Sequence, residues 1–245
     1  MELREVIHQA LDQAEKVWKD HGKQLVEKGE KRAMAMLDHV PSYIPGHPIV
    51  REGEITVGPY IALVADMRKS SEHLLQARKE EPSQLERVYY ETSGLLPGLA
   101  WMINDHKGSV TEYLGDGVLA LFDGSEQPEC VYNAYNAAKG CITSVRDTLN
   151  SELDIRYGLP PIDLGVGLAY SKCAVHLVGL EGARHPKAIG QCVYYATKLS
   201  RGANEIWADL ALEALWPKKK DGPLRFKKIT VPHTKISAFL VEATA

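Results

Sequence analysis

The chain has 245 residues and a formal net charge of −3, which gives no global electrostatic case for binding nucleic acid or an anionic membrane. Its proportions of apolar and charged residues are those of an ordinary globular protein, so it can bury a core without disulfide bridges. The four cysteines form no CxxC pair. They are therefore expected to be reduced thiols of a cytoplasmic protein.

Residues 1–55 are predicted to form a helical extension and linker ahead of a single domain over 56–245. Apolar residues recur at helical spacing in 1–39, and prolines and a glycine then interrupt the pattern in 40–55. No apolar run reaches the roughly 20 residues that cross a bilayer, and the N-terminal segment lacks the apolar core of a signal peptide. Direct insertion into a membrane is therefore not expected.

The pattern changes to that of a strand in "VGPYIALVADM", which ends in Asp66 and Met67. A helix is predicted in the next segment, "RKSSEHLLQARKEE". A second helix follows, with Ser83 as a candidate cap and Pro97 in its interior. In "GSVTEYLGDGVLALFDG", two apolar runs flank a Gly-Asp-Gly. This arrangement predicts a β-hairpin with Asp116 in its turn.

The second half of the chain begins with a long predicted helix over 128–153. We interpret 162–179 as a strand pair with its turn near Ser171 and Lys172, followed by a helix after Gly190. Two strands are expected in the C-terminal tail. The central order β-α-β-β-α-β predicts an α+β fold of the ferredoxin-like type, with helices packed on a mainly antiparallel sheet.

This topology places two carboxylates together. Asp66 ends the first strand and Asp116 lies in the hairpin turn, and the first and second strands are expected to run side by side. Each residue alone is most simply a strand-end cap or a turn residue. Together they form a site for a hard divalent cation such as Mg²⁺ or Mn²⁺, which completes its shell with water and phosphate oxygens. A nucleoside triphosphate is therefore the expected partner.

The motifs resemble those of the class III nucleotidyl cyclases, the adenylate and guanylate cyclase family. "ALVADMRKSS" is similar to the first metal-binding motif and "TEYLGDGVLALF" to the second. "IDLGVGLAYSKCAVHLVGL" is similar to the family's next strand pair, and "AIGQCVYYATKL" resembles the helix that contributes residues across the dimer interface. The resemblance covers about residues 57–210. It implies the cyclase catalytic-domain fold and two metal ions, Mn²⁺ or Mg²⁺, bridged by Asp66 and Asp116.

The cross-interface helix departs from the family at two positions. Tyr194 stands where the family has an Asn, and Lys198 stands where it has an Arg. Lys198 still carries the charge that stabilises a transferring phosphoryl group, although without the planar fork of Arg. Arg201 competes for this role. The resemblance implies a homodimer with shared active sites, in which the metal carboxylates of one chain face this helix of the other.

Other residues are predicted to contact the nucleotide. Backbone amides from Met67 to Ser70 begin a helix and are candidates to hold phosphate oxygens, and the Arg68 side chain is a further candidate. Adenylate cyclases commonly have Lys at the position of Glu112 and Asp at the position of Lys187. Here Glu112 can accept from a ring N–H and Lys187 can donate to a carbonyl, a pattern that fits uracil or guanine, fits cytosine less well and argues against adenine. An ordinary surface ion pair is the alternative.

Four tyrosines lie on segments expected to border the pocket and favour a small base, unless they are core or interface residues: Tyr60, Tyr113, Tyr194 and Tyr195. Together with the chain's length, this pattern resembles the stand-alone pyrimidine cyclases of bacterial Pycsar anti-phage systems. That resemblance implies a product that is cyclic UMP or cyclic CMP and that activates a separate effector protein, and conversion of UTP to cyclic UMP is the favoured interpretation. The alternatives are a cytidylate or guanylate cyclase, or an inactive cyclase-like module that binds nucleotide. An RNA-binding module is excluded because its sequence signature is absent.

Overall fold

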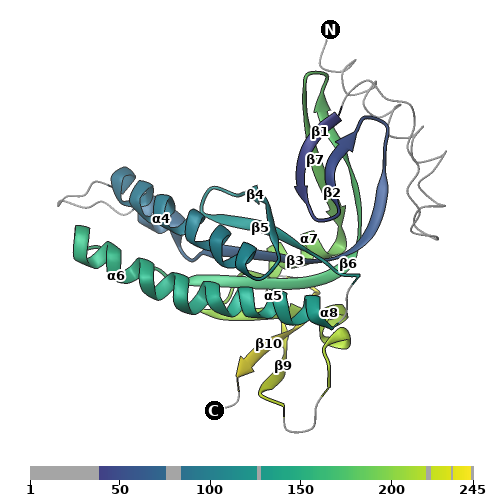
Figure 1. The fold of residues 1–245 in the computed structure, drawn as a ribbon. Helices are drawn as coiled ribbons and strands as arrows, with labels where there is room; N and C mark the ends of the chain where they lie inside the picture. Colours follow the sequence, from purple (N-terminus) through teal and green to yellow (C-terminus); the bar gives the residue numbers. More distant parts are fainter. Residues whose placement is uncertain (1–38, 76–83, 126–127, 219–221, 233, 244–245) are drawn as a thin grey trace.

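The computed structural model describes residues 39–75, 84–125, 128–218, 222–232 and 234–243. An eight-stranded sheet forms its centre, with the strand order β4-β5-β3-β6-β8-β10-β9 and with β7 paired to β6 (Figure 1). Neighbouring strands are antiparallel except for β6 and β8, which are parallel. The strands are β3 (Thr56–Met67), β4 (Ser109–Tyr113), β5 (Gly117–Asp123), β6 (Leu164–Leu180), β7 (Ala183–Gly190), β8 (Glu205–Asp209), β9 (Leu224–Thr230) and β10 (Ser237–Ala243).

The helices divide between the two faces of this sheet (Figure 1). One face carries α4 and the long helix formed by α5, a five-residue π-helical segment and α6, and the larger apolar core lies between these helices and the sheet. The other face carries α7 over a smaller core. The helices are α3 (Ser70–Leu75), α4 (Gln84–Asp105), α5 (Glu129–Gly140), the π-helix Cys141–Val145, α6 (Arg146–Tyr157), α7 (Gln191–Leu199) and α8 (Leu210–Leu215).

The predicted α+β class, with helices packed on a mainly antiparallel sheet, is confirmed. β3, α4, β4, β5, the α5–α6 helix and β6 reproduce the predicted β-α-β-β-α-β order. The predicted strand neighbours were wrong in one respect, since β3 pairs with β5 and β4 lies at the edge beyond it. β5 begins directly after the hairpin turn, so the turn still meets the end of β3. β8 and α8 were not predicted.

Two segments differ from the sequence interpretation. The predicted linker contains a β-hairpin, β1 (His39–Ile44) and β2 (His47–Arg51), which packs Ile44 and Val50 into the core beneath α7. The predicted turn near Ser171 and Lys172 was wrong, because β6 continues through both residues and Lys172 pairs with Pro59 of β3. The helices predicted in 1–39 and the cap at Ser83 lie outside the described residues.

Two glycines of β6 let the backbone at the end of α7 pack directly against the backbone of the sheet. A Cβ atom on Gly167 would lie 2.1 Å from the carbonyl oxygen of Ala196, and one on Gly165 would lie 2.6 Å from that of Ser200. Both neighbours are backbone atoms, which do not yield as a flexible side chain does. These two glycines therefore fix the height of α7 above the sheet.

Gly167→Val is expected to lower the free energy of unfolding by about 1–3 kcal/mol, since the added side chain must displace α7. Gly58→Ala is the matched control, because a Cβ on Gly58 meets only the Tyr60 ring, at 3.5 Å. Chemical denaturation measures both variants. Equal stability of the two would show that α7 is not held at backbone contact.

Candidate active site

Asp66 and Asp116 come together where β3 ends against the β4–β5 hairpin. Asp66 pairs in register with Gly117, the first residue of β5, and the N–H of Met67 donates to the carbonyl of Asp116 over 3.0 Å. A Cβ on Gly117 would lie 2.3 Å from the carbonyl oxygen of Ala65. Glycine at this position is therefore required for the turn and strand to meet so closely.

The hairpin turn is built by the Gly-Asp-Gly itself. Gly115 has a φ of +93°, a conformation that glycine adopts without steric cost. The N–H of Leu114 donates to the carbonyl of Gly117 over 2.9 Å and closes the turn. Local sequence thus fixes the loop that presents Asp116, and sheet pairing fixes its distance from Asp66.

The Asp66 carboxyl lies in an environment that disfavours its charge. Burial, and next the neighbouring charge of Asp116, raise the pKa of Asp66 from 3.8 to about 7, while Arg68 opposes the shift. Nη1 of Arg68 lies 3.4 Å from Oδ2 of Asp66. A divalent cation between two such carboxylates offsets their repulsion and the cost of burial, so the residues present fit a metal ion.

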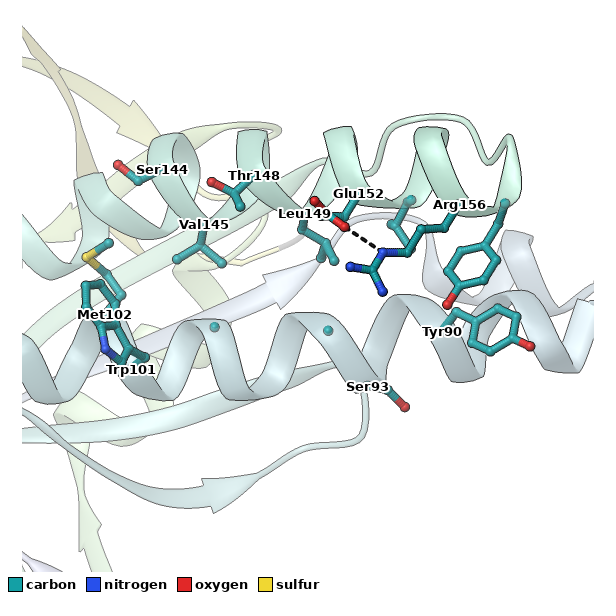
Figure 2. Close-up of a pocket in the computed structure, with 14 residues that line it drawn as sticks. Tyr90, Ser93, Trp101, Met102, Ser144, Val145, Thr148, Leu149, Glu152 and Arg156 are labelled. Atoms are coloured by element: carbon teal, nitrogen blue, oxygen red, sulfur yellow. Dashed lines mark hydrogen bonds and ion pairs between the residues drawn. The ribbon is translucent and has the colours of Figure 1, made fainter.

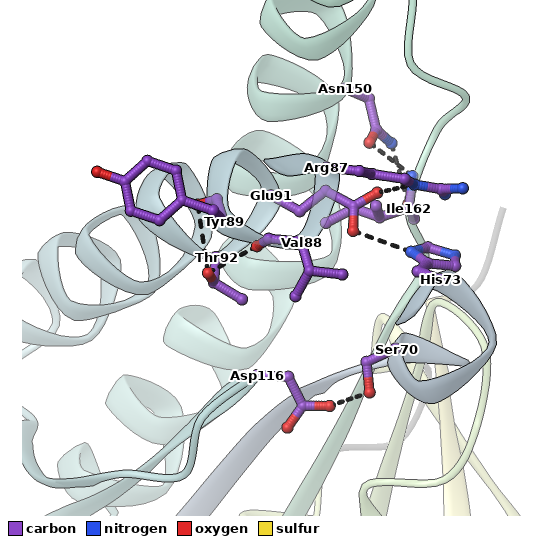
Figure 3. Close-up of polar contacts among 10 residues, drawn as sticks. All are labelled: Ser70, His73, Arg87, Val88, Tyr89, Glu91, Thr92, Asp116, Asn150 and Ile162. Atoms are coloured by element: carbon purple, nitrogen blue, oxygen red, sulfur yellow. Dashed lines mark hydrogen bonds and ion pairs between the residues drawn. The ribbon is translucent and has the colours of Figure 1, made fainter. Parts of the chain in front are cut away.

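Ser70, the first residue of α3, donates a short hydrogen bond from Oγ to Oδ2 of Asp116 (Figure 3). The sequence interpretation used only the backbone of Ser70 and missed this contact. Within the described ranges, no group of three or more His, Cys, Asp or Glu residues is placed to hold a metal. Two carboxylates are enough for Mg²⁺, which takes its remaining ligands from water and substrate phosphates.

The backbone amides of Met67 and Arg68 are already used. Met67 donates to Asp116, as above, and Arg68 N–H donates to the carbonyl of Asp163 over 2.8 Å. In this structure the two amides are therefore not available to phosphate oxygens, contrary to expectation. The Arg68 side chain instead donates from Nη1 to the carbonyl of Ser200, just after α7, over 2.9 Å. It ties the metal-site end of β3 to the end of α7.

Glu112 and Lys187 meet as an ion pair, although 75 residues separate them in the chain. Nζ of Lys187, on β7, lies 2.7 Å from Oε2 of Glu112, on β4. The Lys187 side chain remains 36% exposed and the Glu112 side chain 29% exposed, so both can also contact a ligand that enters from solvent. The structure brings together the two residues that sequence reasoning singled out for base recognition.

The predicted residues of α7 lie on one exposed side of that helix. Tyr194 is 55% exposed, and Nζ of Lys198 lies 5.6 Å from the centre of its ring, a distance suited to a cation–π contact. Arg201 follows α7 and donates to the carbonyl of Pro232 over 3.5 Å. Lys198 is thus presented on the helix face, whereas Arg201 is turned toward the segment between β9 and β10.

Tyr60 does not border the site, so this prediction was wrong. Its side chain is 3% exposed, and its hydroxyl donates to the carbonyl of Pro45 over 3.0 Å. It packs in the core beneath α7, under the β1–β2 hairpin. By contrast, Tyr113 at the end of β4 is 61% exposed, and Tyr195 is partly buried and accepts a hydrogen bond from Gln191.

An apolar groove of about 620 Å³ lies between α4 and α6 (Figure 2). Its lining includes Trp101, Met102 and Leu149, together with the stacked rings of Tyr90 and Tyr157. The groove does not include either aspartate, since α4 and α6 cover one face of the sheet. Asp66 lies on the same face of β3 as Val64 and Ala62, which pack toward α7 on the opposite face of the sheet.

Comparison with known proteins places this fold. No protein-family model matches the chain. "Adenylate cyclase, terminal-differentiation specific" of Dictyostelium discoideum is 27% identical over 103 residues, which are 42% of this chain and 5% of that protein. The chain thus corresponds to a small part of that relative.

Solved structures of cyclases are similar over most of the chain. The guanylyl cyclase Cya2 (TM-score 0.63, 17% identity) covers 77% of this chain and 94% of its own, and the adenylyl cyclase CyaB of P. aeruginosa (0.63, 16%) covers 78% and 97%. The guanylate cyclase domain of RhGC from Catenaria anguillulae, solved in complex with GTP, has a TM-score of 0.57 and 14% identity over 77% of this chain and 98% of its own. The chain therefore has the fold of a nucleotidyl cyclase catalytic domain. Among the described residues, no helix has the length and apolarity to span a membrane.

Proposed function

We propose that the protein is a pyrimidine nucleotide cyclase that converts UTP to 3′,5′-cyclic UMP and pyrophosphate. The observation that carries this proposal is the pair of acidic groups at the end of β3. Asp66 and Asp116 adjoin where β3 ends against the β4–β5 hairpin, and the ion pair between Glu112 of β4 and Lys187 of β7 supplies an acceptor and a donor. Similar folds belong to enzymes that cyclise nucleoside triphosphates.

The reaction is an in-line displacement at the α-phosphorus. The ribose 3′-oxygen forms a bond to this phosphorus as it loses its proton, and the bond to the pyrophosphate leaving group breaks. Divalent cations, when bound, lower the pKa of the 3′-hydroxyl and neutralise triphosphate charge. Asp66 and Asp116 would hold them. Lys198 would stabilise negative charge on the transferring phosphoryl group.

Base choice depends on Glu112 and Lys187. A uracil ring offers an N–H to the Glu112 carboxylate and a carbonyl oxygen to the Lys187 ammonium. Guanine offers the same two groups, whereas adenine has no ring N–H on that edge and no carbonyl oxygen. Tyr113 follows Glu112 directly in the chain and Tyr194 lies on α7, and both are largely exposed. In this proposal they border the base and favour the smaller ring. Tyr60 no longer contributes to this argument, because it is buried.

We propose a homodimer with shared sites, and exposed apolar side chains support it. Large apolar side chains are exposed on the hairpin turn, on β7 and on α7, which are the elements that carry the proposed site: Tyr113, Leu114, Ile189 and Tyr194. A second copy of the chain would cover them. In such a dimer, Lys198 of one protomer serves the carboxylates of its partner.

Complementation tests this arrangement. Asp66→Asn and Lys198→Met are each expected to be inactive as homodimers. A heterodimer purified with two different tags is expected to regain about half of the wild-type rate, because one of its two sites is intact. Product formation is followed by chromatography. A heterodimer as inactive as its parents would show that both residues serve the site of their own chain.

The role we propose for the product is that of a second messenger in anti-phage defence, which activates a separate effector protein. The activity itself is tested by incubating the full chain with Mn²⁺ and each of UTP, CTP, GTP and ATP, and identifying the products. Cyclic UMP is the expected main product. Cyclic CMP or cyclic GMP as the main product would change the proposed substrate to CTP or GTP and leave the proposed cyclase activity standing. No product from any of the four would favour an inactive nucleotide-binding module, to which the Tyr194 and Lys198 departures also point.

A further inference from the structure

A buried polar cluster joins α4 to the short helix that contacts Asp116. The Glu91 carboxylate, on α4, is fully buried. Its Oε1 accepts from Nε of Arg87 over 2.7 Å, and its Oε2 lies 2.9 Å from Nδ1 of His73, on α3. Because Oε2 of Glu91 is placed to accept, Nδ1 of His73 is assigned as the donor. Figure 3 shows the three side chains converging between the two helices.

α3 depends on contacts of this kind for its position. It has six residues, and a helix this short has almost no stability of its own in water. It begins after Lys69, whose φ of 61° is uncommon for a residue other than glycine. His73 lies one turn after Ser70, so both side chains leave the same short helix, one toward Glu91 and the other toward Asp116 (Figure 3).

The bond to Glu91 is also costly to lose. A buried carboxylate that loses one of its partners retains its desolvation cost without the compensating hydrogen bond. The buried hydrogen bond to Glu91 therefore holds His73 against α4 more strongly than a solvent-exposed contact would. The same displacement that breaks this bond would move Ser70 away from Asp116.

We propose that Glu91 and His73 are positioning residues which, through α3 and the Ser70 hydroxyl, hold the Asp116 carboxylate in the orientation that binds the metal ion. This inference rests on the proposed function, because it concerns the metal site of that function. Neither residue touches the substrate or the metal. Partners that orient a metal ligand typically change metal affinity by about 10–100-fold when they are removed.

The test is the affinity of the full-length protein for Mn²⁺ without nucleotide, measured by calorimetric titration. Ser70→Ala and His73→Leu are each expected to weaken binding about 10-fold. Their double variant is expected to bind about as weakly as either single variant, because both break one chain of contacts. His73→Asn is expected to restore binding, since its amide places an N–H near the position of Nδ1.

Thr92→Val is the matched control. The Thr92 hydroxyl bonds only within α4, donating to the carbonyl of Val88 over 2.7 Å, so its loss is expected to leave Mn²⁺ affinity unchanged. If His73→Leu does not fold, Glu91→Gln removes the charge with nearly the same shape and is expected to weaken Mn²⁺ binding in the same direction.

The outcomes separate this inference from the function on which it rests. Wild-type affinity in His73→Leu or Glu91→Gln, or additive losses in the double variant, would overturn the positioning role while leaving the cyclase proposal intact. A wild-type protein that binds no Mn²⁺ would overturn both. A loss in His73→Leu that His73→Asn does not restore would show general damage to α3 and would also overturn the positioning role.

Discussion

Asp116→Asn is expected to abolish nucleotide cyclisation and, at the same time, to stabilise the metal-free protein. The rate is expected to fall by at least about 100-fold, because the metal site loses one of its two carboxylates and the transferring phosphoryl group loses charge stabilisation. Stability is expected to rise because Asp116 is the neighbouring charge that, after burial, does most to raise the pKa of Asp66. Removing it relieves this repulsion.

The sign of the pH dependence follows from the same shift. The pKa of Asp66 is about 7 in the folded protein, against an ordinary value of 3.8, so protonation favours folding and stability is lost as the pH rises through about 7. Metal-free wild-type protein is therefore expected to melt at a lower temperature at pH 8 than at pH 6. Asp116→Asn should show a smaller decrease. After solvent screening is allowed for, the free energy of unfolding of Asp116→Asn at pH 8 is expected to exceed that of the wild type by about 1 kcal/mol, which raises the melting temperature by about 2–4 °C.

Thermal unfolding with and without Mn²⁺ measures both effects. Mn²⁺ is expected to raise the melting temperature of the wild type more at pH 8 than at pH 6, because the cation competes with the proton on Asp66. It is expected to leave Asp116→Asn nearly unchanged. Asp123→Asn, at the far end of β5, is the control for loss of an exposed carboxylate. Full activity in Asp116→Asn would overturn the metal site.

Exchange of the charges of Glu112 and Lys187, the pair proposed to read the base, is expected to change the substrate. In Glu112→Lys/Lys187→Asp, the ammonium can donate to a ring nitrogen of adenine and the carboxylate can accept from its amino group. The wild-type carboxylate and ammonium complement uracil or guanine instead. The double variant is expected to lose about 100-fold or more in kcat/KM for UTP and to gain activity with ATP, because a mismatched base leaves its own polar groups and those of the pair without hydrogen-bond partners in the complex.

The single variant Glu112→Lys serves as a control for this exchange. Glu112→Lys alone sets two like charges side by side and is expected to lose activity with every nucleotide. The fold should be unaffected in the double variant, because a partly exposed ion pair contributes only about 0–1 kcal/mol and the reversed pair keeps opposite charges in contact. A double variant that retains the wild-type preference for UTP would show that Glu112 and Lys187 form only a surface ion pair.

Much of this fold was readable from local pattern. The apolar alternation ending in Asp66, the Gly-Asp-Gly of the β4–β5 hairpin and the long helical run from Glu129 were each predicted and are present. Such features depend on residues close together in the chain, where periodicity and turn chemistry act directly. The adjacency of Asp66 and Asp116 also followed, because the order of elements restricts which strands can meet.

Other features depended on contacts that local pattern does not encode. Ser171 and Lys172 have a turn-like composition, yet β6 continues through them because the whole of β3 pairs with this part of β6. Tyr60 has the amphipathic character of a pocket residue, but the β1–β2 hairpin covers it. The Ser70 contact to Asp116 gave no sequence signal, because a serine hydroxyl beside a carboxylate is specified only by the placement of α3.

The sequence by itself determined the class of fold, the two carboxylates and the inverted charges of Glu112 and Lys187, because these follow from residue type, spacing and the order of elements. Only the tertiary structure decided that Glu112 and Lys187 touch, that Arg68 ties the end of β3 to the end of α7, and that Glu91 is linked to α3, whose Ser70 contacts Asp116, through His73. The physical reason is that such contacts are set by how whole strands and helices pack. A hydrogen bond over about 3 Å depends on the positions of both elements that it joins, and the sequence close to either residue does not determine those positions.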